Sequence, residues 1–459
     1  MNSIKEVCEK IWEIEEENDL LRVELQGIKV WEVIRFSVFN IITNKLGFYG
    51  SAHSTANKTI LSKIKKGQML VANSFTKNPF RSSFKGNTMI LDHPRKVKVN
   101  GDYIDIYSQK LLSNMDSEGF FVVEYPYLDK HFSDHSDPNR SYMDIFYAYA
   151  TFKMPFMLFK FNKEELDILL KIEGLLNESF DVNMKLKNLI YKKIITFKLK
   201  YYFFDSLLKK KKPDNIVLVV SYSNFPLIAA AKDNDIEVTE LQHGVITNYH
   251  FAYNFSDPKK IIKYFPDKLL TFGEYWAKTD GFPKQTEVEV YGFPYLNQQL
   301  EKYKGTQKKK RQVLFLSQGT IGKELSKRAK EVAESMPEYH FIYKLHPGEY
   351  SRWRKEYPDL LMGSNLDNLQ VVDHNEKNLY SFFAESEYQV GVYSTAIFEG
   401  LTMDCKTILF NLKGIEYMQD LIEQDLVMVA NDKIEFINNI ENFNVKQVDK
   451  GHFFKTVNT

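Results

Sequence analysis

From residue 215 onward, short apolar runs alternate with segments of helical pattern. The first of them read NIVLVVSY, FPLIAAAKDND and IEVTELQHG, and a second series opens with QVLFLSQG beyond residue 312. Continuous apolar runs are typical of strands buried on both faces, and alternation with helices requires parallel strands joined by crossovers. The sequence therefore predicts an α/β fold with two Rossmann-like lobes of parallel sheet that face a central cleft.

The length supports two lobes, because 459 residues exceed what one hydrophobic core usually organises. The polar, basic stretch 303–312 is the predicted linker. Apolar runs at 68–74, 88–94 and 120–126 are predicted strands of the first lobe. The predicted divisions are an N-terminal helical segment over 1–60, a first lobe over 61–305 with a helical insertion at about 141–210, a second lobe over 306–430, and a C-terminal helix and tail over 431–459 that packs back on the first lobe.

Charge and cysteine content exclude several classes of protein. Lys and Arg number 61 against 60 Asp and Glu, so no overall field favours nucleic acid. Two cysteines, Cys8 and Cys405, cannot form a disulfide framework and fit a reducing compartment. The longest apolar stretch, 216–231, is too short and too interrupted to span a bilayer. We expect a cytoplasmic protein whose membrane contact, if any, is peripheral, through Lys63–Lys66 or Lys209–Lys212; solvated loops or helix ends are the alternative for these runs.

Four strand ends of the second lobe carry polar, turn-forming residues. In parallel sheets, ligands bind beyond the carboxyl ends of the strands, where helix N-termini attract anions. The four segments are Ser317-Gln318-Gly319-Thr320, Lys344-Leu345-His346-Pro347-Gly348, Asp373-His374 and Tyr393-Ser394-Thr395. Their clustering predicts a nucleotide site in this lobe.

Within that site, each motif has an expected role. The pair Ser394-Thr395 would cap a helix and receive a phosphate, and Glu399, one turn later, could reach a ribose hydroxyl. His346 could neutralise charge on the leaving phosphate. Taken alone, each of these residues could equally be structural. The predicted donor-binding residues are Ser317, Gln318, Gly319, Thr320, Lys344, His346, Pro347, Ser394, Thr395 and Glu399.

A histidine also follows a predicted strand of the first lobe, in Gln242-His243-Gly244. Its ordinary pKa suits it to take a proton from an acceptor hydroxyl, and Gly244 allows a close backbone approach. The sequence predicts His243 and His346 as catalytic residues, with Gln242 and Gly244 on the acceptor side. A structural histidine at position 243 is the alternative, and His250 is a weaker candidate.

We expect no metal and no other cofactor. Asp233-Asn234-Asp235 has a metal-binding spelling but falls before a strand, where a helix-ending turn explains it. A loop bears His131, Asp134, His135 and Asp137 without recognised ligand spacing. No Gly-rich dinucleotide fingerprint or Walker loop occurs.

The chain resembles the GT-B transferases of bacterial surface polysaccharide assembly. The segments that carry the resemblance are LQHG at 241–244, DKLLTFGEYW with EVEVYGFP within 267–294, YKLHPGEY at 343–350 and YSTAIFEGL at 393–401. The group includes capsule Kdo transferases, polysialyltransferase-like enzymes and CDP-glycerol glycerophosphotransferases. The resemblance covers about 215–415 and implies a GT-B-like fold, His243 as base, and His346, Ser394 and Thr395 at the donor phosphate; the acidic motif of polysialyltransferases, Asp-Asp-Gly or Glu-Asp-Gly, is absent.

The sequence thus predicts a metal-independent glycosyltransferase that moves a sugar from a nucleotide donor, a CMP-linked acidic sugar being favoured, to a surface polysaccharide. Its expected partners are the nucleotide sugar, a glycan or lipid-linked acceptor, and the inner face of the cytoplasmic membrane, without nucleic acid. A polyol-phosphate transferase on the same fold, a sugar-nucleotide epimerase and a glycan-binding scaffold are the alternatives.

Overall fold

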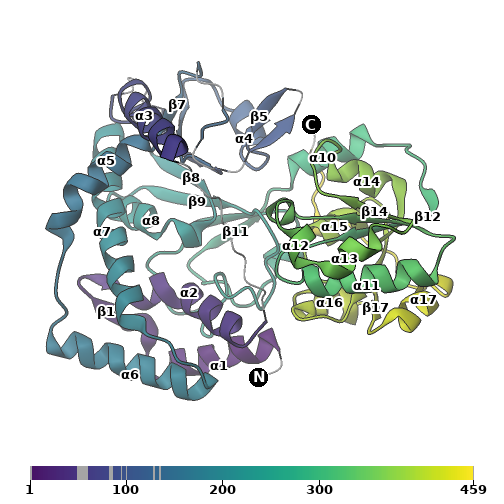
Figure 1. Cartoon of the computed structure of the whole chain (residues 1–459). Coiled ribbons are helices and arrows are strands. Elements are labelled where there is room, and N and C mark those ends of the chain that lie inside the picture. The colour runs from purple at the N-terminus through teal and green to yellow at the C-terminus, as the bar shows by residue number, and fades with distance from the viewer. Residues whose placement is uncertain are drawn as a thin grey trace.

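Two parallel sheets form two lobes (Figure 1). The computed structural model describes residues 3–48, 60–81, 86–94, 96–99, 101–127, 130–133 and 136–457. The first sheet has seven strands in the order β11-β10-β9-β8-β3-β6-β7, and the second has six in the order β14-β13-β12-β15-β16-β17. In both, the chain moves outward first to one side and then to the other of a central pair, which is the doubly wound order. The predicted two-lobed α/β fold is confirmed.

The first lobe begins with β3 and ends with β11. Its strands are β3 (Thr88–Asp92), β6 (Phe120–Glu124), β7 (Arg140–Tyr142), β8 (Asn215–Val219), β9 (Glu237–Leu241), β10 (Lys268–Thr271) and β11 (Glu287–Val290). Its helices include α3 (Ile60–Thr76), α5 (Asp144–Lys153), the 3-10 turn η2 (Met154–Met157), α6 (Lys163–Phe180), α7 (Leu186–Lys211), α8 (Phe225–Lys232) and α9 (Glu274–Ala277). The long apolar face of α7 packs on the sheet through Phe203 and Leu207, both buried.

The second lobe repeats the pattern with shorter crossovers. Its strands are β12 (Lys309–Leu316), β13 (His340–Lys344), β14 (Leu369–Val372), β15 (Ser386–Gly391), β16 (Lys406–Phe410) and β17 (Met428–Ala430). The crossover helices include α11 (Gly322–Ser335), α14 (Leu379–Glu385) and α15 (Thr395–Thr402), and α17 (Lys433–Glu441) packs against α11. Strand β12 starts inside the predicted linker, at Lys309.

One predicted strand is wrong. Residues 68–74, QMLVANS, lie within helix α3. A short apolar run does not by itself distinguish a strand from a helix. Here Asn73 and Ser74 are buried while Val71 and Phe75 are exposed, so the apolar side chains do not supply the buried face that a central strand needs. The sequence also gave no signal for the small hairpin of β4 (Val97–Val99) and β5 (Asp102–Ile104).

The N-terminal helices form a layer against the first lobe. Helices α1 (Ile4–Glu17) and α2 (Val30–Lys45) are joined by the short hairpin β1 (Glu24–Leu25) and β2 (Ile28–Lys29). Arg35 of α2 is buried and pairs with Glu15 of α1 through Nε, at 2.8 Å. Its guanidinium also donates to the carbonyls of Phe251 and Asn254. The layer therefore fixes the loop that follows β9.

The chain crosses between the lobes more than once. Helix α10 (Pro294–Lys302) lies with the second lobe, where Tyr295 is 5.8 Å from Tyr380, ring centre to ring centre. Residues beyond 449 return to the first lobe: the Trp276 indole donates to the carbonyl of Phe453, and the Lys455 amide donates to that of Phe272. None of the helices in the described ranges is both long enough and apolar enough to cross a bilayer.

The Arg35–Glu15 pair gives a stability prediction. Replacing Arg35 with Ala leaves the buried Glu15 carboxylate without its cation, so we expect the free energy of unfolding to fall by about 3–5 kcal/mol. The control is Lys5→Ala, which removes an exposed 3.9 Å contact to Glu9 and should cost less than about 0.5 kcal/mol. Urea unfolding of both variants checks this; equal midpoints would contradict it.

Candidate functional site

The doubly wound order places a switch point in each lobe. In the first lobe it lies between β3 and β8, and in the second between β12 and β15. Ligands of such sheets bind outside the carboxyl ends of the strands at that point. The segments after β12, β13 and β15 are therefore neighbours, and three of the four predicted strand-end motifs meet there. Asp373-His374, the fourth, follows β14 at the edge of the sheet.

Glu349 ties the second-lobe loops together. Its buried carboxylate accepts hydrogen bonds from Ser317 Oγ (2.9 Å), the backbone amide of His346 (2.7 Å) and the Tyr357 hydroxyl (2.6 Å). Burial raises the pKa of Glu349 despite these donors. Ser317, predicted to bind the donor, is thus buried and holds the loop after β13 in place.

The rest of the Ser317–Thr320 loop contacts the neighbouring loops of the lobe. Gln318 Oε1 is buried and accepts no hydrogen bond among the described residues. The Thr320 hydroxyl lies 2.8 Å from that of Tyr393, which links this loop to the one after β15. Arg352, which no sequence pattern marks, donates to the carbonyls of Gly319 and Gly348 at 3.2 Å each and pairs with Glu356 through Nη1. It brings a cation, partly balanced by Glu356, between the loops after β12 and β13.

His346 is exposed, and Lys344 is not. His346 caps the 3-10 turn η4 (Pro347–Glu349), accepting from the Gly348 amide through Nδ1 at 3.1 Å, while Pro347 occupies the first position of the turn. Lys344 is buried, and its Nζ contacts the Tyr350 hydroxyl (2.5 Å) and the carbonyl of His374 (2.8 Å). Burial lowers the pKa of Lys344 to about 8. Lys344 therefore braces the loop after β14 in this arrangement.

Ser394 and Thr395 open helix α15 as expected. The Ser394 hydroxyl accepts from the Ala396 amide at 3.2 Å, in extended backbone geometry typical of a cap. Glu399 lies one turn on, close to the Tyr380 hydroxyl. Burial raises the pKa of Glu399 to about 7, so its carboxyl is only partly ionised near neutral pH.

In the first lobe, His243 is held from two sides. Its Nε2 lies 3.3 Å from the Tyr222 hydroxyl, and its carbonyl accepts from the Tyr107 hydroxyl at 3.0 Å. Gln242 is buried and bridges the loop, donating to the Gly244 carbonyl and accepting from the Phe272 amide. Burial, with His250 and His93 nearby, lowers the pKa of His243 to about 3. The imidazole is neutral at physiological pH.

Unpaired polar atoms gather at the end of β9 and in the segment that follows it. In the described part of the chain, the buried atoms Glu240 Oε2, His243 Nδ1, Thr247 Oγ1 and His250 Nδ1 lack a hydrogen-bond partner. Buried polar atoms without a partner are uncommon and call for a specific explanation. A polar ligand at this loop would supply the missing partners. The signal favours His243 over a purely structural histidine.

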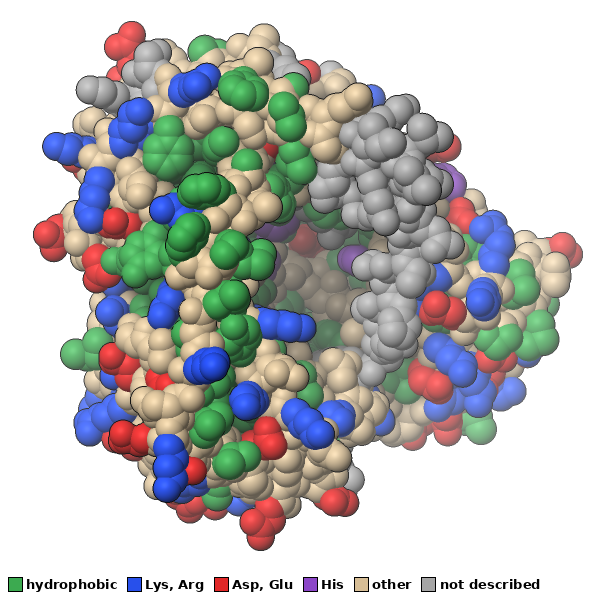
Figure 2. Space-filling view, turned by 60° about the vertical axis from the view of Figure 1, so that its left-hand side comes forward, with side chains coloured by type: hydrophobic (Ala, Val, Ile, Leu, Met, Phe, Trp, Pro, Cys, Tyr) green, Lys and Arg blue, Asp and Glu red, His purple; other side chains and the backbone are tan. Residues whose placement is uncertain are grey.

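The two lobes meet at this loop. A β-carbon placed on Gly244 would lie 3.5 Å from the Thr395 hydroxyl oxygen, so the first-lobe His-Gly turn touches the start of α15. Figure 2 shows the molecule hollowed between the lobes, with histidine and acidic side chains on the wall of the hollow. His243, Gly244, Ser394 and Thr395 are thus brought together from distant parts of the sequence.

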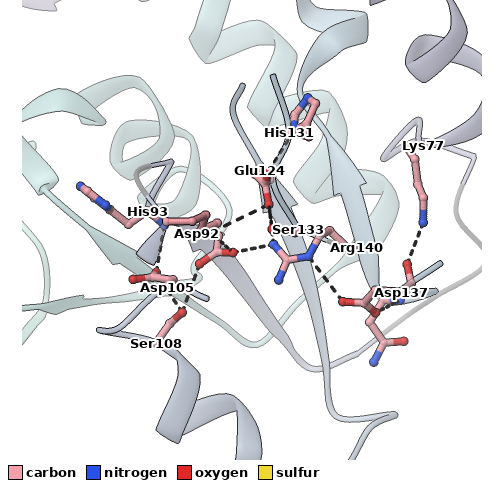
Figure 3. A network of polar contacts seen from close by, with 12 residues as sticks. Lys77, Asp92, His93, Asp105, Ser108, Glu124, His131, Ser133, Asp137 and Arg140 are labelled. Atoms are coloured by element: carbon pink, nitrogen blue, oxygen red, sulfur yellow. Dashed lines mark hydrogen bonds and ion pairs between the residues drawn. The ribbon is translucent and has the colours of Figure 1, made fainter. Parts of the chain in front are cut away.

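A buried charge network lies beside this point, at the carboxyl ends of β3 and β6 (Figure 3). Arg140 Nη1 is 2.5 Å from Asp92 and 2.7 Å from Glu124, and Lys96 also pairs with Asp92. His131 is held at both ring nitrogens, by Glu124 at 2.9 Å and Asp144 at 2.6 Å. Both acids that end the strands are therefore tied to cations inside the lobe.

The network reaches the cleft through Asp105. Its carboxylate accepts from the backbone amides of His93 and Tyr107, the residue whose hydroxyl holds His243. Burial, together with the neighbouring Asp92, raises the pKa of Asp105 to about 8. Although burial opposes it, Lys96 and Arg140 keep the pKa of Asp92 well below its usual range.

The sequence carried a signal for this network. Asp92 and Glu124 end two predicted apolar strands, and the rule applied to the second lobe would have placed them at one edge. The loop considered for metal binding contributes His131, which is fully occupied by carboxylates, and Asp137; Asp134 and His135 lie outside the described residues. No group of three or more His, Cys, Asp or Glu in the described ranges is arranged to hold a metal ion. Asp233 caps α8 in a turn, as predicted.

No protein-family model and no curated protein matches this sequence. Among solved structures, the chain is similar to the UDP-GlcNAc 2-epimerase of Methanocaldococcus jannaschii, at 12% identity and a TM-score of 0.45 over 78% of this chain and 94% of that one. It is similar to the epimerase of Neisseria meningitidis (13%, 0.44, 78% and 94%) and to a glycosyltransferase of Rickettsia africae (12%, 0.39, 78% and 88%). Its structural neighbours thus include glycosyltransferases and UDP-GlcNAc 2-epimerases. Similarity of this extent concerns the fold, and the reaction has to be inferred from the residues of the cleft.

The buried state of His243 gives a titration prediction. In the free protein its ring should stay neutral down to about pH 4, because burial holds the pKa at about 3. A bound nucleoside diphosphate would bring negative charge close to the ring and raise that pKa. Histidine ring NMR signals recorded against pH, with His243→Asn for assignment, check this. An unliganded pKa near 6.5 would contradict it.

Glu399 gives a pH prediction. Because burial raises its pKa above the ordinary 4.5, the folded state holds a proton that the unfolded chain releases, and the free energy of unfolding falls as pH rises from about 4.5 to 7. Glu399→Gln should remove that loss, stabilising the protein at pH 8 by on the order of 1–3 kcal/mol relative to its effect at pH 4.5. The exposed Glu324→Gln, on α11, is the control. Parallel melting-temperature profiles for wild type and Glu399→Gln would refute this.

Proposed function

We propose that the chain is a metal-independent glycosyltransferase that uses a nucleotide-activated sugar, with a CMP-linked acidic sugar favoured, and a surface glycan or lipid-linked glycan as acceptor. The observation that carries the proposal is the contact between Gly244 and Thr395. It joins a loop with unpaired buried polar atoms to a capped helix start, across two doubly wound lobes. A nucleotide held there would have its phosphates between the two.

On the donor side, positive charge would come from the protein itself. The start of α15 offers a dipole and backbone amides, Arg352 lies between two strand-end loops, and His346 is exposed beside it. These groups would stabilise the charge that grows on the departing phosphate. Glu399, on the same helix, would accept hydrogen bonds from ribose hydroxyls once it is ionised.

On the acceptor side, His243 would take the proton. With Nε2–H donating to the Tyr222 hydroxyl, Nδ1 keeps its lone pair and is the atom that lacks a partner. The donor's negative charge would raise the low pKa of this ring and so make it a better base when substrate is bound. The close approach of Gly244 and Thr395 means that the lobes separate to admit the donor and close again around it.

The first experiment is a ligand screen followed by product analysis. Thermal shift against CMP, CDP, UDP, GDP and ADP identifies the nucleotide, because a ligand that binds the native state raises the melting temperature. Incubation with the matching donor sugars and glycan acceptors then shows the reaction by mass. A product heavier by one sugar supports the proposal. An added polyol phosphate identifies a polyol-phosphate transferase, an isomeric donor formed without acceptor identifies an epimerase, and binding of no nucleotide favours a glycan-binding scaffold.

A kinetic prediction concerns the two histidines. His243→Asn and His346→Ala should each lower turnover by roughly two orders of magnitude, the size typical of acid–base and electrostatic contributions. His340→Ala is the matched control. His340 is the first residue of β13, at the opposite end of that strand from His346. Near-normal turnover in both site variants would show that these roles are wrong.

A further inference from the structure

A group of large apolar side chains stands exposed on the outer side of the first lobe. Phe152, Met154, Phe156 and Leu158 fall within seven residues at the end of α5 and along η2, and Phe156 is 74% exposed. Tyr202, on the adjoining α7, is also exposed. Globular proteins rarely leave such a group in water unless it binds something. We name these five residues the aromatic face.

Acidic residues are missing from the segments that build this face. The stretches 145–163 and 182–204 contain no Asp or Glu, although the whole chain has 60. The same stretches contain nine lysines: Lys153, Lys160, Lys163, Lys185, Lys187, Lys192, Lys193, Lys198 and Lys200. In Figure 2, hydrophobic and basic side chains intermix down this side of the molecule. The chain as a whole is nearly neutral, so this region departs sharply from its average.

Lysines lie beside the aromatic face. Lys198 precedes Tyr202 by four residues on α7, so both side chains lie on one side of that helix, and Lys198 Nζ is 5.5 Å from the centre of the Phe159 ring. Lys160 is exposed two residues after Leu158. A surface where lysines interleave with exposed aromatic side chains, on segments that lack acidic residues, favours a negatively charged partner.

The lysine runs chosen from the sequence are less suited to this role. Lys211 is buried under the end of α7 near Phe121, and Lys209 pairs with Asp205 at 2.8 Å. The side chains of Lys63–Lys66 lie outside the described residues. The run 209–212 is a helix end, in agreement with the alternative given to it.

We propose that the aromatic face, with Lys160 and Lys198 beside it, docks the first lobe on an anionic lipid bilayer. Phenylalanine and leucine side chains would enter the boundary between headgroups and acyl chains, while lysines meet lipid phosphates. A bilayer suits the face because its exposed side chains, which come from one turn and the neighbouring helix, combine large apolar groups with nearby lysines. Docking is independent of the donor nucleotide, so vesicle binding and transferase activity can fail separately.

Vesicle sedimentation of the full chain tests this. We expect binding to vesicles of phosphatidylcholine with 30% phosphatidylglycerol, weaker binding at 0.5 M salt, and little to phosphatidylcholine alone. Phe152→Ser with Phe156→Ser should reduce binding at least tenfold. Lys160→Gln with Lys198→Gln should reduce binding to the anionic vesicles about tenfold, since each lysine close to an anionic surface strengthens binding severalfold.

Ile434→Ser is the matched control, because Ile434 is 63% exposed on α17 of the other lobe. Unchanged binding in this control supports the proposal. It is overturned if the wild type does not bind anionic vesicles, or if the phenylalanine variant binds as the control does. It is also overturned if sedimentation velocity shows the wild type to be a dimer that the phenylalanine variant dissociates, because the face would then join two copies of the chain.

Discussion

The buried guanidinium of Arg35 supports much of the first lobe. Besides Glu15 and two loop carbonyls, it lies 4.0 Å from the centre of the Phe251 ring and 4.2 Å from that of Phe255. A charge this deep is stable only when every donor finds a partner, so the loop cannot move without breaking several contacts at once. The loop follows directly from the His243 turn. An N-terminal helix pair with no chemistry of its own thereby sets the position of a candidate catalytic residue.

In each lobe, some residues at the cleft hold the loops in place and others lie where a ligand would bind. In the second lobe, Glu349 and Lys344 use their polar atoms to hold loops, while His346, Arg352 and the start of α15 lie at the strand ends around the switch point. In the first lobe, the same division holds between Gln242, which braces, and His243, which has an unpaired nitrogen. Sites built this way fix the geometry of reacting groups through neighbours that never touch the substrate.

The fold was largely readable from the sequence, and the site only in part. The alternation of apolar runs with helical segments predicted both sheets, because a strand that is buried on both faces consists mainly of apolar residues. Strand-end position selected His243 and Ser394, whose turns meet where the lobes touch, but it could not separate them from Ser317 and Lys344, which are buried inside the lobe. Arg352 lies in a polar helical turn with no pattern to mark it. Asp92 and Glu124 also lie at the carboxyl ends of strands, so the same criterion applies to them.

Helix α3 shows the other limit. The apolar run within α3 is compatible with a strand as well as a helix. The packing of α5 against α3 determines which of its side chains are buried. Pairings between segments far apart in the chain, such as Arg35 with residue 254, leave no local trace either.

The return of residues 450–457 to the first lobe has a consequence for the order of synthesis. Gly273 is pressed against the carbonyl of Phe453, so closely that a β-carbon there would lie 2.4 Å from its oxygen. The partner of that surface leaves the ribosome only after every strand of the other lobe has been made. A nascent chain therefore holds Trp276 and its neighbours uncovered until the second lobe has been made, and completion of the first-lobe surface is coupled to translation of the second lobe.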